Sequence, residues 1–135
     1  FNDSDANNDG KEQLIKEFAL FTAKLHESGV LHCDYSPGNI LYGKIADEGD
    51  HQYEFSLVDI NRMQFKPVSV EMGCENFARM RGNDDFFKTV ATYYAKARNY
   101  DVESCVEKFL HYKREDRAKR AKKERFKQLR KKIFA

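Results

Sequence analysis

The chain has 135 residues, 41% of them hydrophobic and 34% charged, a composition that predicts one globular domain with a single core. Its formal net charge is only +2, and no apolar run approaches the roughly 20 residues needed to span a bilayer. The three cysteines, Cys33, Cys74 and Cys105, form no C-x-x-C pair, which disfavours a zinc site or a disulfide framework and fits a reducing compartment.

The first ten residues, 1–10, are polar and are expected to form a linker. The stretch from Asp5 to Gly10 resembles the start of an EF-hand calcium loop. Lys16, however, occupies the position at which such a loop needs a bidentate Glu. We therefore expect a flexible linker that ends in a turn, and we do not favour a calcium site.

An amphipathic helix is predicted over Lys11–Ser28, because apolar side chains recur there at the helical period: Leu14, Phe18, Phe21 and Leu25. Gly29 is expected to end this helix, since glycine favours the C-terminal stop. His26 falls at the buried end of the helix, where we prefer a structural role for it over metal binding.

The next segment reads H-x-D-x-x-x-x-N from His32 to Asn39 and is followed by two apolar stretches. We predict that Ile40–Tyr42 and Tyr53–Val58 form antiparallel strands, joined by the polar stretch between them. Such a hairpin would bring Asp59, which follows the second strand, next to Asn39.

Phosphoryl-transfer enzymes of the kinase type need an acidic side chain at the substrate hydroxyl and two oxygen ligands for the Mg²⁺ of the nucleotide. Asp34, Asn39 and Asp59 fit these roles in that order. A Pro37-Gly38 turn between Asp34 and Asn39 would aim both side chains into one cleft.

These residues resemble the catalytic loop and metal-binding Asp of the protein-kinase-like superfamily, and most closely the bacterial lipopolysaccharide core kinases (the Kdo-kinase-like group). The resemblance is specific over Lys11–Phe65 and looser to about Tyr112. It implies an enzyme that transfers the γ-phosphoryl group of ATP in line to a sugar hydroxyl of a lipid-linked saccharide, on Kdo or heptose. It also implies a cytoplasmic location at the inner face of the inner membrane.

The same resemblance implies a role for each motif residue. Asp34 would be the catalytic base, and Asn39 and Asp59 would be ligands of Mg²⁺. His32 would be a buried residue that organises the catalytic loop.

Departures from the protein-kinase pattern favour a small-molecule acceptor. Cys33 stands where many protein kinases carry Arg, Ser36 where they carry Lys, and Ile60-Asn61 follows Asp59 in place of Phe-Gly. Ser36 and Arg62 are candidates for contact with the substrate, with a structural ion pair as the alternative for Arg62.

After Asp59, residues 64–69 are expected to be irregular because Pro67 restricts the backbone. Helices are predicted over Val70–Arg81 and Asp84–Arg98, and Asp101 is predicted to cap a third, long helix. Arg79 and Arg81 have weaker claims than Arg62 to a phosphate or acidic sugar. The apolar face of the second helix is interpreted as core packing rather than a sugar platform: Phe86, Phe87, Val90, Tyr93, Tyr94 and Ala97.

The small net charge conceals a sharp division along the chain. Residues 1–112 contain 12 basic and 19 acidic side chains, whereas residues 113–135 contain 12 basic and 3 acidic, a net charge of +9. The tail favours helix and carries a weak apolar stripe of Phe126, Leu129 and Ile133. It is either a solvated helical extension or a surface that attracts anionic lipid or phosphorylated glycolipid. Nucleic acid is the least favoured partner because the tail has no folded recognition motif.

The fold class predicted is α+β, mainly α: a protein-kinase-like C-terminal lobe with one small β-hairpin at the catalytic loop and a long basic C-terminal helix. Its divisions are a linker (1–10), the lobe (11–112) and the tail (113–135). The sequence contains no G-x-G-x-x-G or G-x-x-x-x-G-K-[ST] motif, and it starts at Phe1 rather than Met. We therefore expect a piece of a longer protein that is inactive without its N-terminal lobe.

Two other functions stay open at this point. One is a small-molecule phosphotransferase acting on an amine-bearing sugar or choline, which an acidic acceptor pocket would favour. The other is a non-catalytic kinase-like scaffold that binds membrane or protein partners.

Overall fold

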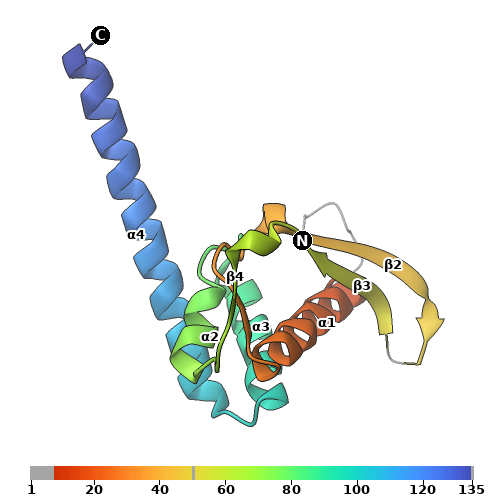
Figure 1. Cartoon of the computed structure of the whole chain (residues 1–135). Helices are drawn as coiled ribbons and strands as arrows, with labels where there is room; N and C mark the ends of the chain where they lie inside the picture. Colours follow the sequence, from red (N-terminus) through yellow and green to blue (C-terminus); the bar gives the residue numbers. More distant parts are fainter. Residues whose placement is uncertain (1–7, 50, 135) are drawn as a thin grey trace.

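The structure, a computed structural model, describes residues 8–49 and 51–134 and has the α+β, mostly helical architecture expected. Three helices, α1 (Asn8–Glu27), α2 (Val70–Asn76) and α3 (Asp84–Ala97), pack with the first turns of α4 (Val102–Phe134). Figure 1 shows a hairpin projecting from one side of this helical body and the outer half of α4 projecting from the other.

Side-chain caps determine where several of the helices start. The Asn83 side chain accepts a hydrogen bond from Phe86 N at the start of α3, and Ser69 does the same for Met72 N at the start of α2. Asp101 Oδ2 accepts from Ser104 N at 2.9 Å, which confirms its predicted role as the cap of α4.

The core is formed by aromatic side chains of α1, α3 and α4 together with Phe77, which follows α2, and Tyr35. Phe77 lies at its centre, with its ring 4.7 Å from Phe109, 5.1 Å from Tyr94 and 5.8 Å from Phe18. All four are almost fully buried, as is Tyr35. The predicted packing of the apolar face of α3 into the core is therefore confirmed for Phe86, Phe87, Val90, Tyr93 and Tyr94, whereas Ala97 is exposed.

The described residues form two separate sheets of two strands each: the hairpin that we predicted and a second sheet that we did not predict. The predicted hairpin is present as β2 (Ile40–Glu48) and β3 (His51–Leu57), whose strands include most of the polar stretch expected to be a loop. Glu17 of α1 explains part of this extension, because its Oε1 accepts from Gln52 N at 2.8 Å and Tyr53 N at 3.1 Å.

The second sheet pairs β1 (Val30–His32) with β4 (Met63–Phe65) in antiparallel register. The expectation of irregular structure over residues 64–69 is thus wrong at its start. A hydrogen bond from Lys66 N to Gly29 O, 2.9 Å long, continues the pairing by one residue. Each strand has three residues, too few for an alternating pattern to be recognised.

α2 ends at Asn76 rather than at the predicted Arg81. The backbone tightens there into three-residue turns, with Ala78 N donating to Glu75 O and Met80 N to Phe77 O. Phe77 and Met80, which belong to these turns, are both buried in the core.

α4 continues without interruption across the boundary predicted between residues 112 and 113. Contacts with the lobe persist beyond that point, because Arg117 donates to Ala78 O at 3.0 Å and to Met80 O at 2.7 Å. The turns after residue 118 are exposed. None of the described helices is long and apolar enough to cross a membrane.

Two of the cysteines lie closer together than their spacing in the sequence suggests. Cys74 of α2 and Cys105 of α4 are free and buried, and their sulfur atoms are 3.7 Å apart. Cys33 is free and exposed.

Candidate active site

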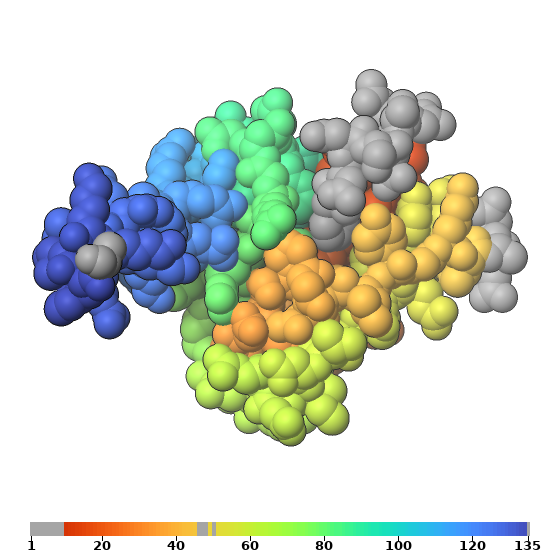
Figure 2. Space-filling model, turned by 90° about the horizontal axis from the view of Figure 1, so that it is seen from above, coloured from red at the N-terminus to blue at the C-terminus, as the bar shows by residue number. Residues whose placement is uncertain are grey.

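The candidate site is built on the catalytic loop, which we define as residues 32–39. The loop runs from the end of β1 through a 3₁₀ turn, Pro37–Asn39, into β2. Figure 2 shows it in orange, between the yellow-green segment that follows β3 and the green α2–α3 connection. Elements distant in sequence therefore meet at the loop.

The Asp34 carboxylate is held from two sides. Asn39 Nδ2 donates to its Oδ2 at 3.2 Å and to the Asp34 carbonyl oxygen at 2.8 Å. On the other side, Arg79 Nη1 donates to Oδ1 at 2.5 Å. These bonds fix the position of the Asp34 side chain, which is still 28% exposed and therefore accessible to a ligand.

His32 connects the loop to the end of β3. Its ring is fully buried, with Nδ1 accepting from Asp34 N at 3.1 Å. The other ring nitrogen, Nε2, then carries the proton and donates to Val58 O at 2.9 Å. One neutral imidazole thus joins Asp34 to the residue that precedes Asp59.

Asn39 and Asp59 occupy adjacent places at the base of the hairpin. Ile40 pairs with Leu57 in the strand register, and Val58 N donates to Asn39 O at 3.0 Å. The predicted return of Asp59 to the side of Asn39 is confirmed at the level of the backbone.

Asp59 has a left-handed backbone conformation, with φ 59° and ψ 56°. This conformation costs a residue other than glycine about 1–2 kcal/mol, although Asp tolerates it better than most. Such conformations concentrate at functional sites, because only the surrounding structure can hold them. Here the turn is held by Arg62 N donating to Asp59 O at 3.1 Å and Cys33 N donating to Arg62 O at 2.7 Å.

Asn39 and Asp59 have the chemistry required of Mg²⁺ ligands. The amide nitrogen of Asn39 is used on Asp34, so its Oδ1 is the atom that can face a metal. The exposed carboxylate of Asp59 is the second oxygen donor. Within residues 8–49 and 51–134 there is no group of three or more His, Cys, Asp or Glu that could hold a metal ion.

A buried hydrogen-bonded chain supports the loop from below. Asn76 Nδ2 donates to His32 O at 2.9 Å, and its Oδ1 accepts from His26 Nε2, also at 2.9 Å. His26 Nδ1 then accepts from the Tyr94 hydroxyl at 2.7 Å, which itself accepts from Arg98 Nη1 at 3.0 Å. Burial lowers the pKa of His26 to about 4, so the ring stays neutral in this chain. His26 is therefore a structural residue, as its position at the helix end indicated.

The two substrate-contact candidates are placed differently. Ser36 is half-buried within the loop, where its carbonyl accepts from Asn39 N at 2.9 Å. The Arg62 side chain is exposed and makes no ion pair with any residue in the described part of the chain. The structural ion pair considered for Arg62 is not found there, and its contact with substrate stays a prediction.

Sequence reasoning missed two residues of the site. Arg79, given only a weak claim, contacts Asp34 directly across 45 positions of sequence. Asn76 was not singled out, although it joins His26 to the loop. A lone Arg or Asn in a helical stretch has no spacing pattern that would reveal either contact.

One family of known proteins matches most of the chain. Residues 2–100 match the model of the family described as lipopolysaccharide kinase (Kdo/WaaP). No curated protein and no solved structure gave a significant match. The family match spans more than two thirds of the sequence, and the chain belongs to the lipopolysaccharide kinase (Kdo/WaaP) family.

Proposed function

We propose that the protein carrying this chain transfers the γ-phosphoryl group of ATP to a sugar hydroxyl of the lipopolysaccharide core, on Kdo or heptose. The observation that carries this proposal is the arrangement of Asp34 between Asn39 and Arg79, with Asp59 next to Asn39. A base, two oxygen donors and a cation within one small region are what phosphoryl transfer to an alcohol requires.

Asp34 is the base in this proposal. It accepts the proton of the sugar hydroxyl on a carboxylate oxygen and orients that hydroxyl for in-line attack on the γ-phosphorus. Hydrogen bonds to both oxygens keep the carboxylate in one orientation, which supplies the positioning on which this reaction depends. His32 holds the loop through its backbone contact and does not touch the reacting atoms.

Asn39 Oδ1 and the Asp59 carboxylate are the proposed ligands of Mg²⁺. A Mg²⁺ ion held by these two residues would supply positive charge that offsets the negative charge of the nucleotide phosphates. The left-handed turn at Asp59 and the hydrogen bond from Arg62 N to Asp59 O fix the backbone of Asp59 at the base of the hairpin. Ser36 and Arg62 are proposed to contact the substrate, Ser36 from within the loop.

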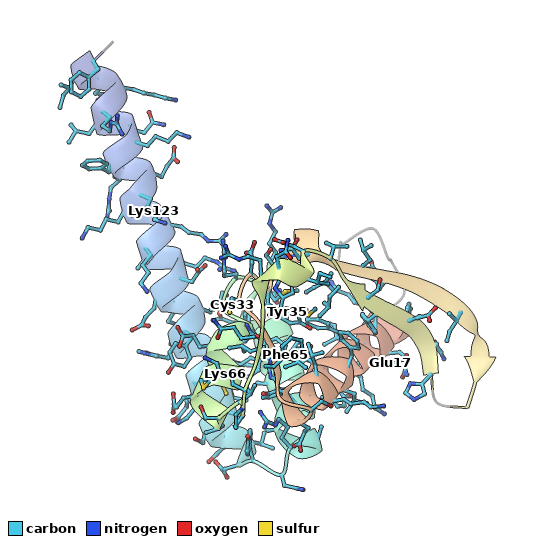
Figure 3. All side chains as sticks on the ribbon, in the orientation of Figure 1. Glu17, Cys33, Tyr35, Phe65, Lys66 and Lys123 are labelled. Atoms are coloured by element: carbon cyan, nitrogen blue, oxygen red, sulfur yellow. The ribbon has the colours of Figure 1, made fainter. Side chains whose placement is uncertain are left out.

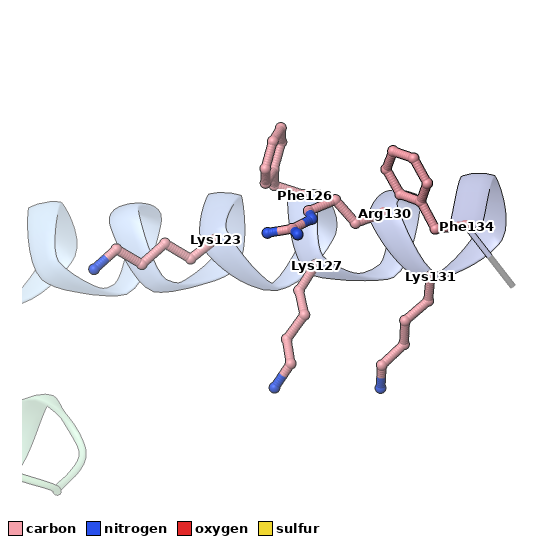
Figure 4. Close-up of a pocket in the computed structure, with 6 residues that line it drawn as sticks. All are labelled: Lys123, Phe126, Lys127, Arg130, Lys131 and Phe134. Carbon is pink, nitrogen blue, oxygen red and sulfur yellow. The ribbon is translucent and has the colours of Figure 1, made fainter.

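For the location of the protein, we propose peripheral attachment to the inner face of the inner membrane through α4. Exposed apolar side chains on its outer turns are Phe126, Leu129, Ile133 and Phe134. In Figure 4, Phe126 and Phe134 project from one side of the helix, while Lys127 and Lys131 project from the opposite side. An anionic bilayer complements this combination of apolar rings and a net charge of +9 over residues 113–135.

The transfer reaction is tested with full-length protein, radiolabelled ATP, Mg²⁺ and purified lipopolysaccharide core. We expect label in the saccharide and a loss of turnover by orders of magnitude in Asp34→Asn, with ATP binding retained. Full turnover in Asp34→Asn would refute the role of Asp34. If the wild type transfers phosphate neither to the core nor to an aminoglycoside, the non-catalytic kinase-like scaffold is favoured.

Membrane attachment is tested by sedimentation with anionic lipid vesicles. The double variant Phe126→Ser/Ile133→Ser should co-sediment with these vesicles less than wild-type protein does, and equal sedimentation would refute contact through α4.

A further inference from the structure

A pocket of about 340 Å³ lies beside the catalytic loop, on the side of Asp34 away from the hairpin. This volume is at the lower end of the range for small-ligand sites. Cys33 and Tyr35, which flank Asp34 in sequence, line one wall, and the inner turns of α4 line another. Figure 3 shows Cys33 and Lys66 near α2, on the side of the lobe from which α4 departs.

The pocket and the proposed Mg²⁺ ligands lie on different sides of Asp34. Arg79 lines the pocket and binds Oδ1 of Asp34, whereas Asn39 binds Oδ2. Neither Asn39 nor Asp59 lines the pocket. Asp34 therefore separates a side suited to nucleotide and metal from a side open to a second ligand.

The cations of this pocket come from three elements. Lys66 follows β4, Arg79 lies in the α2–α3 connection, and Lys119 belongs to α4. Arg79 is paired with Asp34, but Lys66 and Lys119 make no ion pair with any residue that the structure describes. Two ammonium groups at one pocket are thus left for a ligand.

Three carboxylates also line the pocket, and two of them are already paired. Asp116 Oδ2 accepts from Arg117 and from Arg120, each at 2.9 Å. Glu115 lies 3.2 Å from His111 Nε2. Glu75 is the third carboxylate. The lining residues thus include three cations and three carboxylates, but two of the cations, Lys66 and Lys119, and only one of the carboxylates, Glu75, make no ion pair with any described residue.

We propose that this pocket binds an anionic group of the acceptor saccharide, a carboxylate or a phosphate, through Lys66, Arg79 and Lys119. A hydroxyl of the same saccharide then meets Asp34, because Arg79 contacts both the pocket and the base. The guanidinium has five N–H donors, so it can hold Asp34 with Nη1 and an acceptor anion with others. This assignment rests on the proposed function, and it places α4 in the acceptor site.

The test is calorimetric titration of the nucleotide-free, full-length protein with deacylated lipopolysaccharide core oligosaccharide, which lacks the acyl chains that a membrane-binding helix would contact. We expect Lys66→Gln and Lys119→Gln each to weaken binding roughly tenfold, since each removes a charge-assisted contact. Lys119→Arg should retain most of the affinity. Lys132→Gln, a charge loss at the far end of α4 and outside this pocket, should leave it unchanged.

Treating the oligosaccharide with phosphatase distinguishes the two anions: retained lysine-dependent binding identifies a carboxylate, and lost binding identifies a phosphate. Wild-type affinity in both Lys66→Gln and Lys119→Gln, equal weakening in Lys132→Gln, or absence of binding by the wild type would overturn the pocket assignment. If lysine-dependent binding is present but no phosphoryl transfer occurs, the proposed function fails while the pocket assignment stands.

Discussion

The buried imidazole of His26 should make the stability of the chain depend on pH in the mildly acidic range. His26 is 1% exposed, with both ring nitrogens in hydrogen bonds, and its pKa is lowered from 6.5 to about 4 chiefly by burial. Because the folded-state pKa lies below the unfolded-state pKa, the unfolded chain binds this proton first as pH falls. Stability is therefore full above about pH 6.5 and decreases from there to about pH 4.

The size of this effect follows from the two pKa values. Linkage predicts a loss of about 2 kcal/mol at pH 5 and about 3 kcal/mol at pH 4, relative to neutral pH. His26→Gln removes the titrating group while keeping one donor and one acceptor at the site. The variant should be less stable at pH 7, but its stability should fall less steeply than that of the wild type as the pH is lowered.

The assay is denaturant unfolding of the chain between pH 7 and pH 4.5, followed by far-UV circular dichroism because the sequence has no tryptophan. His111→Gln is the matched control, since it makes the same substitution at a histidine whose side chain is largely exposed. Parallel profiles for wild type and His26→Gln would refute the idea that His26 is held neutral by burial.

Three further changes test the packing around the site by denaturant unfolding. Gly73→Ala places a Cβ in steric conflict with the Tyr94 hydroxyl, so we expect a loss of more than about 2 kcal/mol of stability despite the better helix propensity of Ala. Adding Tyr94→Phe to this variant should recover part of the loss, and a stabilised Gly73→Ala would contradict the packing described. His32→Leu should cost about 2–3 kcal/mol of stability, because it leaves Asp34 N and Val58 O without their hydrogen-bond partner. Unchanged stability would show that the His32 ring does not join these two backbone groups. Arg117→Ala should cost about 1–3 kcal/mol of stability through loss of its hydrogen bonds to Ala78 O and Met80 O. The control Arg125→Ala, at an exposed position, should change stability by less than about 0.5 kcal/mol. Equal effects of the two substitutions would show that Arg117 does not anchor α4.

Much of the fold is predictable because it depends on local patterns. Short windows of sequence reveal the apolar period of α1, the Asp101 cap of α4 and the two strands of the hairpin. The hairpin also explains why Asp59 could be placed beside Asn39 in advance: antiparallel pairing brings the residue before one strand next to the residue after the other.

The contacts that escaped prediction are long-range and involve single residues. The β1–β4 sheet, the Arg79–Asp34 pair and the approach of Cys74 to Cys105 each join positions more than 30 residues apart. Asn76 links two histidines only because α2 ends where it does, and helix ends are the least determined features of a sequence. The left-handed turn at Asp59 likewise depends on bonds from Arg62 and is not indicated by Asp alone.

The central claim is that Asp34, Asn39 and Asp59 form the working site of an ATP-dependent kinase. Calorimetric titration of the full-length protein with ATP, with and without Mg²⁺, tests it most directly. We predict Mg²⁺-dependent binding by the wild type and by Asp34→Asn, and loss of the Mg²⁺ dependence in Asp59→Asn. No Mg²⁺-dependent binding by the wild type, or wild-type behaviour in Asp59→Asn, would contradict the claim.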